Sequence, residues 1–128
     1  MDYGELVKIA QETRKNAYAP YSKFKVGAAL LTKSGRIYTG VNVENASFGA
    51  TNCAERTAVF KAVSEGEDEI YAIAVASDSE EFIHPCGICR QVLSEFGKGS
   101  MKVICSNKKE EYRVYTLEEL LPQGRIPL

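Results

Sequence analysis

Residues 24–42 read FKVGAALLTKSGRIYTGVN, and this stretch decides the fold of the chain. Two apolar runs, 24–31 and 36–42, flank the turn-forming sequence KSG at 33–35, which predicts a β-hairpin. A further run, IYAIAVA at 70–76, is uniformly apolar, as expected of a central strand that is covered on both faces. The sequence therefore predicts a sheet whose middle is buried from both sides.

Segments with helical spacing surround these strands. Asp2 with Glu5 three residues later predicts a capping box, and the helix that it opens must end before Pro20. Broad apolar faces predict two more helices, over 54–64 and 87–96, and a glycine follows each of them. All three helices have an apolar face to bury, so we expect them to pack on the sheet.

The C-terminal third predicts a second hairpin, from 101–106 and 112–115, and then a short helix over 116–121. The order of elements is helix, strand, strand, helix, strand, helix, strand, strand, helix. This order predicts one α/β domain over 1–128, with a five-stranded mixed sheet as the middle of three α-β-α layers.

The composition excludes several classes of protein. Hydrophobic residues make up 45% and charged residues 26% of the 128, which argues against a disordered tail, a collagen-like repeat or a coiled coil. Basic and acidic residues number 16 and 17, so a nucleic-acid partner is not favoured. No apolar run approaches the roughly 18 residues of a membrane span, and the acidic start is unlike a signal peptide. We therefore expect a cytoplasmic protein without a membrane partner.

The four cysteines are the most informative residues. Cys53 begins the second predicted helix, and Cys86 and Cys89 share one face of the first turn of the third. Helix starts favour thiolates, so three sulfurs could hold a tetrahedral zinc with its fourth position open. Cys105 lies in an apolar strand and is expected to be a buried bystander. His84 is the only histidine and is expected to be an exposed loop residue rather than a ligand.

Two charged residues follow the first of these cysteines. Glu55 lies in the first turn of an otherwise apolar helix, where it could simply complement the helix dipole. Beside an open metal position it becomes the candidate general base for hydrolysis. Three thiolates and Zn²⁺ sum to a charge of −1, which the guanidinium of Arg56 would balance. A solvent-facing arginine remains the alternative.

The cysteines and the charged residues beside them form two short motifs, CAER at 53–56 and PCGICR at 85–90. Together these motifs resemble the metal-binding motifs of the zinc-dependent cytidine deaminases. The likeness extends over nearly the whole chain, through AYAPYSKFKVGAAL at 17–30, TGVNVENA at 39–46 and ELLP at 119–122. Cysteine as the first ligand resembles the small, homotetrameric branch.

The resemblance implies hydrolytic deamination of cytidine and 2′-deoxycytidine to the uridines and ammonia, in pyrimidine salvage, with one zinc per chain. It implies that Glu55 carries protons between the attacking water, the pyrimidine N3 and the leaving amine. It places Asn42 and Glu44 at the ribose 3′-hydroxyl and Phe24 against the pyrimidine. Ala54 would supply a backbone contact to the base.

Two departures from the family leave the substrate open. The segment QGRIPL at 123–128 lacks the aromatic that commonly reaches a neighbouring subunit's site, and offers Arg125 and Ile126 instead. Phe48 stands where a tyrosine is frequent. Deamination of a modified cytosine nucleoside such as blasticidin S therefore remains an alternative to cytidine.

Two other interpretations of the cysteines stay open. A thiol-disulfide oxidoreductase would use CGIC at a helix start, but it leaves Cys53, Glu55 and Arg56 without a role. A purely structural zinc module would want a fourth protein ligand, for which the sequence offers no good candidate.

Overall fold

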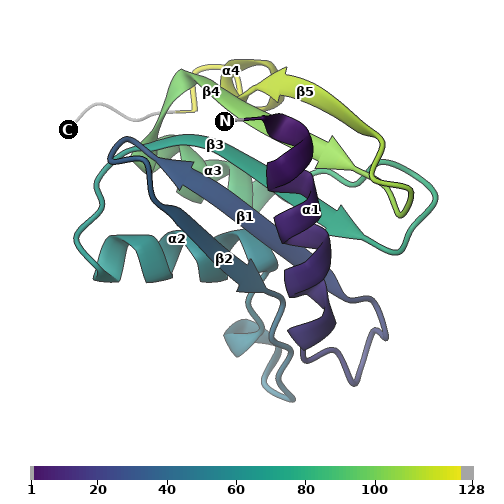
Figure 1. The fold of residues 1–128 in the computed structure, drawn as a ribbon. Coiled ribbons are helices and arrows are strands. Elements are labelled where there is room, and N and C mark those ends of the chain that lie inside the picture. The colour runs from purple at the N-terminus through teal and green to yellow at the C-terminus, as the bar shows by residue number, and fades with distance from the viewer. Residues whose placement is uncertain (1, 125–128) are drawn as a thin grey trace.

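The hairpin expected from residues 24–42 is present in the computed structural model, which describes residues 2–124 (Figure 1). Strand β1 (Val26–Thr32) pairs antiparallel with β2 (Ile37–Val41), and Gly35 turns between them with a φ of 89°. β1 begins two residues later than predicted. Lys23 has a φ of 62°, which breaks the extended backbone just before Phe24.

The sheet has five strands in the order β2-β1-β3-β4-β5. β3 (Ile70–Ser77) is central, as predicted, and pairs parallel with β4 (Gly97–Ser106), while every other pair is antiparallel. β5 (Tyr112–Thr116) forms one edge of the sheet and β2 the other. The strand predicted at 101–106 was too short, because β4 begins at Gly97, directly after the preceding helix.

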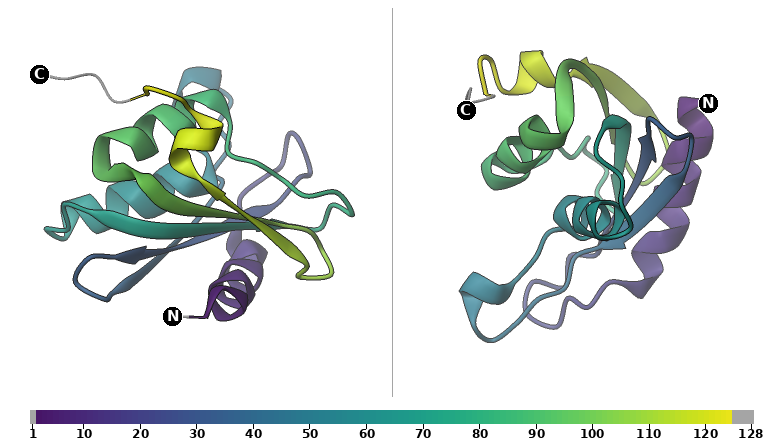
Figure 2. Two further views of the ribbon diagram at one scale, coloured as in Figure 1. Left: turned by 90° about the horizontal axis from the view of Figure 1, so that it is seen from above. Right: turned by 90° about the vertical axis from the view of Figure 1, so that its left-hand side faces the viewer.

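Helices cover both faces of this mixed sheet (Figure 2). α1 lies on one face, and α2, α3 and α4 lie on the other, which confirms the three-layer prediction. The helices are α1 (Tyr3–Thr13), α2 (Ala54–Ser64), α3 (Gly87–Phe96) and α4 (Leu117–Leu120), with short 3₁₀ turns at Arg14–Asn16 and Phe48–Ala50. Across the described residues 2–124, no helix has the length and apolarity needed to cross a bilayer.

The central strand β3 contributes side chains to two separate hydrophobic cores, one on each face of the sheet. Ile73 and Val75 face the α2–α3 side, where they join Leu30, Val59 and Leu93. The alanines at 72, 74 and 76 face the other way and pack against α1. Both sets are buried, so alternation between residues 72 and 76 of β3 produces no polar face.

The helix caps differ in part from the prediction. The Asp2 side chain caps α1 by accepting a hydrogen bond from the Gly4 amide at 2.9 Å, but no return bond from Glu5 is found among the described residues. A complete capping box opens α4 instead, where Thr116 and Glu119 satisfy each other's backbone amides. Because α4 is so short, the hydrogen bonds of its capping box stabilise it more than its own helical hydrogen bonds do.

A glycine allows α2 to lie close to the sheet. A Cβ on Gly40 of β2 would stand 2.4 Å from the Ala58 amide nitrogen and 2.5 Å from the Ala54 carbonyl oxygen. Because both neighbours are helix backbone, Gly40→Ala must push α2 outward. We expect it to lower the free energy of unfolding by about 1–3 kcal/mol, measured by urea denaturation.

Gly49→Ala is the matched control for this substitution. A Cβ on Gly49 would meet nothing within 4 Å, so the free energy of unfolding of Gly49→Ala should match that of the wild type. Equal stability of the two variants would contradict a role for the close approach at Gly40.

Candidate active site

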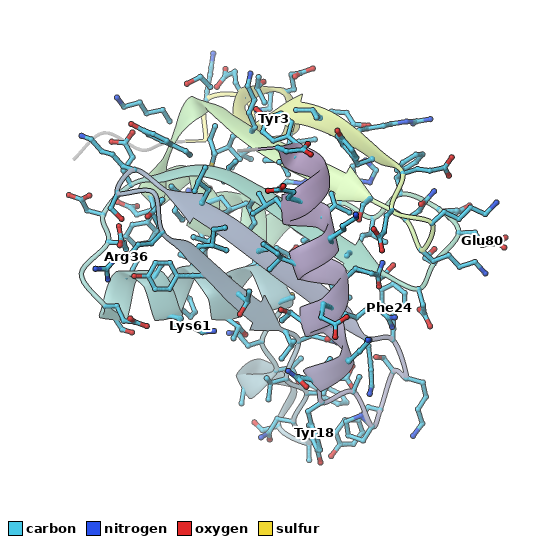
Figure 3. The ribbon with its side chains drawn as sticks, in the orientation of Figure 1. Tyr3, Tyr18, Phe24, Arg36, Lys61 and Glu80 are labelled. Atoms are coloured by element: carbon cyan, nitrogen blue, oxygen red, sulfur yellow. The ribbon has the colours of Figure 1, made fainter. Side chains whose placement is uncertain are left out.

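One cavity of about 420 Å³ collects most of the residues that the sequence singled out. It lies where the starts of α2 and α3 meet the lead-in to β1 and the end of β2. Figure 3 shows Phe24 on this lead-in, at the end of the sheet away from Arg36 and the β1–β2 turn. The lining residues are Ser22, Phe24, Val26, Asn42, Glu44, Thr51, Asn52, Cys53, Ala54, Glu55, Ile83, His84 and Cys86.

Three cysteines form a compact group beside this cavity. The Sγ atoms of Cys53 and Cys86 are 3.8 Å apart, and those of Cys86 and Cys89 are 3.4 Å apart. All three lie within 4.8 Å of one another. Cys53 and Cys86 are the N-caps of α2 and α3, so the two helix starts bring the sulfurs together. Cys105 is buried in β4 outside the group, as expected.

This group fits zinc. A tetrahedral ion with Zn–S bonds of about 2.3 Å requires sulfurs about 3.8 Å apart, close to the separations observed. Hydrogen bonding from Cys89, and then from Arg56, lowers the pKa of Cys53 to about 5, so the group stabilises a thiolate. The pKa of Cys89 is raised, because its thiol keeps the proton that it shares with Cys53. Within residues 2–124 the group gains no fourth ligand, which would leave one position of the ion open.

Two arginines support the cysteines from different sides. Nη2 of Arg56 lies 3.3 Å from Sγ of Cys53, so its guanidinium meets the sulfurs and not only solvent. Arg90 was not singled out from the sequence, although it belongs to the PCGICR motif. Its Nε donates to the Pro85 carbonyl at 2.8 Å and its Nη1 to the Leu120 carbonyl at 2.9 Å. Arg90 thereby fixes the backbone immediately before Cys86.

Glu55 is buried at the edge of the cavity. Its residue exposure is 5%, and burial raises the pKa of its carboxyl to about 7. A carboxyl with such a pKa can both accept and release a proton near neutral pH. Glu55 is therefore more than a surface acid complementing the dipole of α2.

Asn42 and Glu44 hold the loop that carries Phe24. The Asn42 side chain accepts a hydrogen bond from the Val26 amide and donates one to the Phe24 carbonyl, both at 2.8 Å. Glu44 accepts from the amides of Tyr21 and Ser22, at 2.9 and 3.1 Å, and from the Ser22 hydroxyl. Each of these bonds joins residues far apart in the sequence, so the local pattern gave no sign of them.

The hydrogen bonds at Glu44 predict a pH effect on stability. The hydroxyl of Ser22, followed by its amide, holds the pKa of Glu44 below its ordinary value. A lowered folded pKa gives stability that is present above the unfolded pKa, roughly pH 4.3, and is lost as the pH falls through the folded pKa. We expect the melting temperatures of wild type and Glu44→Gln to converge as the pH falls below this value. A difference in melting temperature between the two proteins that stays constant down to about pH 3 would contradict this account.

Phe48 does not line this cavity. Phe48 is 83% exposed and borders a separate shallow hollow with Tyr21 and Asn45. Arg125 and Ile126, expected at the rim of a neighbouring site, fall outside the residues that the structure describes.

Comparisons with known proteins show the family of this chain. Residues 2–106 match the family model for the cytidine and deoxycytidylate deaminase zinc-binding region. A cytidine deaminase of Halalkalibacterium halodurans is 51% identical over 95% of this chain and 92% of its own length. One of Sporosarcina psychrophila is also 51% identical, over 95% of this chain and 90% of its own.

Solved structures give the same result. The crystal structure of cytidine deaminase from Burkholderia pseudomallei superposes with a TM-score of 0.91, at 47% identity and over 96% of this chain and 98% of that one. The enzyme from Mycobacterium tuberculosis superposes with a TM-score of 0.84, at 38% identity and over 96% of both chains. The motifs at the helix starts, the three-cysteine group and the shared fold place this chain in the zinc-dependent cytidine deaminase family.

Proposed function

We propose that this chain hydrolyses cytidine and 2′-deoxycytidine to uridine and 2′-deoxyuridine, with release of ammonia and with one zinc ion per chain. The observation that carries the proposal is the meeting of Glu55 and the three-cysteine group at one nucleoside-sized cavity. The similar proteins and solved structures described for the site are cytidine deaminases, which supports the same substrate.

Binding would use the walls of the cavity. Phe24 offers an aromatic ring for the pyrimidine, and the Ala54 backbone at the start of α2 offers polar groups to the base. Asn42 and Glu44 keep lone pairs and a donor beyond those that hold the loop, and these would bind the ribose 3′-hydroxyl. One pair of side chains would thus orient both the sugar and the aromatic wall.

Proton transfer would fall to Glu55. Zinc held by Cys53, Cys86 and Cys89 would supply Lewis acidity, which makes water nucleophilic at neutral pH. Glu55 accepts a proton as water adds to C4 of the base, and passes it to N3. It then takes the proton of the new C4 hydroxyl and delivers it to the amine as the C4–N bond breaks, so that cytidine and water become uridine and ammonia. Arg56 offsets negative charge on the sulfurs throughout.

The alternative substrate is not favoured. The lack of an aromatic at 123–128 is the feature that favours blasticidin S, but the similar proteins from Halalkalibacterium, Sporosarcina and Burkholderia are all named cytidine deaminase. We propose pyrimidine salvage as the role, in the cytoplasm, with small nucleosides rather than nucleic acid as partners. All four cysteines are free thiols, which is consistent with a reducing compartment.

We also propose a homotetramer. Phe48 is a large apolar side chain left almost fully exposed beside the hollow that adjoins Glu44. A neighbouring subunit that covers it would also close the rim of the site. Light scattering after size exclusion gives the mass directly, and a monomer of unchanged activity would exclude this assembly.

Cytidine turnover with and without a chelator tests the proposed function. We expect the loss of cytidine absorbance to stop once zinc is removed and to return when zinc is restored. Blasticidin S is assayed in parallel. Fast turnover of blasticidin S with none of cytidine would replace the proposed substrate, and turnover indifferent to zinc removal would exclude the proposed chemistry.

A further inference from the structure

The β3–α3 loop is fixed to the edge strand β5 by two contacts between side chains. The guanidinium carbon of Arg113 lies 4.4 Å from the ring centroid of Phe82. The rings of Tyr115 and His84 have centroids 5.4 Å apart and planes inclined at 57°. Both partners on β5, and both on the loop, are two residues apart, so one side of the strand holds the loop at two points. We refer to these four residues as the β5 clamp.

The clamp presents His84 to the active-site cavity. His84 lines the cavity and belongs to no group of metal-binding residues within 2–124. Its Nε2 lies 3.5 Å from the Tyr115 hydroxyl, so Tyr115 meets the imidazole with its hydroxyl as well as with its ring. Among the cavity-lining residues, Phe24 and His84 carry the aromatic rings.

The position of His84 in the chain decides which part of a ligand it meets. It stands two residues before Cys86, so the two Cα atoms are within about 7 Å of each other. The reacting C4 of a pyrimidine must lie at the cysteine group, whereas Glu44, from another part of the chain, marks the sugar end. His84 therefore borders the base.

We infer that His84 is a specificity-determining residue, whose imidazole ring packs against the pyrimidine while the β5 clamp holds the ring in place. The inference rests on the proposed function and deepens it. A flat ring against a flat base gains contact that an aliphatic side chain cannot match. The contact is made equally with the bound substrate and with the transition state. Its loss therefore raises KM and leaves kcat unchanged.

Two substitutions of the histidine test the contact. His84→Ala should raise KM for cytidine about 3- to 10-fold, with kcat and the zinc content unchanged. His84→Phe keeps a flat ring and should bind cytidine nearly as well as the wild type. An unchanged KM in His84→Ala, or a KM in His84→Phe as high as in His84→Ala, overturns the inference.

A truncated substrate locates the contact. With 3′-deoxycytidine, the ratio of KM in His84→Ala to KM in the wild type should equal the ratio found with cytidine. The corresponding ratio for Glu44→Gln should shrink, because its partner hydroxyl is missing. A His84→Ala ratio that also shrinks on 3′-deoxycytidine would place the histidine at the sugar and overturn a contact with the base.

The positioning role of Tyr115 has its own test. Tyr115→Leu should raise KM in the same direction as His84→Ala, and should add nothing further in the His84→Ala background. Tyr115→Phe retains the ring and should restore the wild-type KM. Tyr112→Leu removes an exposed tyrosine from the same strand, away from His84, and serves as the control. Additive effects of Tyr115→Leu and His84→Ala would exclude the clamp.

These outcomes are separable from those for the proposed function. A wild-type chain that fails to deaminate cytidine disproves the function. A wild-type chain that turns cytidine over, with His84→Ala indistinguishable from it, disproves only the role of His84.

Discussion

Glu55→Gln is expected to bind zinc and fold as the wild type does, yet to lose at least about 10³-fold in kcat. Glutamine has the size of glutamate but neither accepts nor releases a proton at neutral pH. One positioned acid or base contributes about 10²–10⁴-fold, and Glu55 would serve at more than one proton transfer. Its burial leaves little water to take over the task.

Single-turnover rates with cytidine, on enzyme of known zinc content, measure this loss directly. Glu118→Gln is a suitable control, since that carboxylate lies on α4 and does not line the cavity. Near-normal turnover by metal-loaded Glu55→Gln would remove Glu55 as the proton carrier, whatever the geometry of the site.

Cys53→Ala is expected to lower bound zinc from about one ion per chain to near zero, and to abolish activity with it. Two thiolates and open coordination positions hold zinc far more weakly than three thiolates do. The fold should survive, because the cores on both faces of the sheet are formed by other residues.

Cys105→Ala is the matched control for this loss of metal. Its thiol is buried in β4, where burial raises the pKa to about 12, so it offers no thiolate. Elemental analysis of both purified variants settles the assignment. Zinc retained by Cys53→Ala but lost from Cys105→Ala would show that the wrong cysteine had been assigned.

The helices were the easiest part of the fold to predict. Residues 54–64 and 87–96 match α2 and α3 because each has an N-cap cysteine, an apolar face and a glycine near its end. The first half of β4 was missed because Lys98, Gly99 and Ser100 are polar and exposed, like a loop. β3 pairs with Gly97 and then with Lys102 and the residues after it, so 98–100 lie between two paired segments. A local pattern cannot report such a long-range partner.

The candidate site was predictable where short motifs carry the chemistry. The three cysteines lie at helix starts, and the structure brings them together as their spacing predicts. The roles of Glu55 and Arg56 follow from their place beside Cys53 and stay predictions. The sequence did not predict three sets of contacts. These are the hydrogen bond from Arg90 to the end of α4, the hydrogen bonds that hold the Phe24 loop, and the β5 clamp at His84. Each depends on tertiary contacts between segments far apart in the chain.

The placement of β3 between the two ligand-bearing helices has a consequence for folding. Cys53 and Cys86 are 33 residues apart, and in an unfolded chain their encounter has an entropic cost that grows with the logarithm of the loop. In the folded chain that encounter is already complete, because β3 is hydrogen-bonded between β1 and β4. Zinc must therefore bind the native state more tightly than the unfolded state, and each tenfold rise in free zinc above the dissociation constant adds about 1.4 kcal/mol of stability. A single ion thus acts as a reversible cross-link, whose strength follows the metal content of the surroundings.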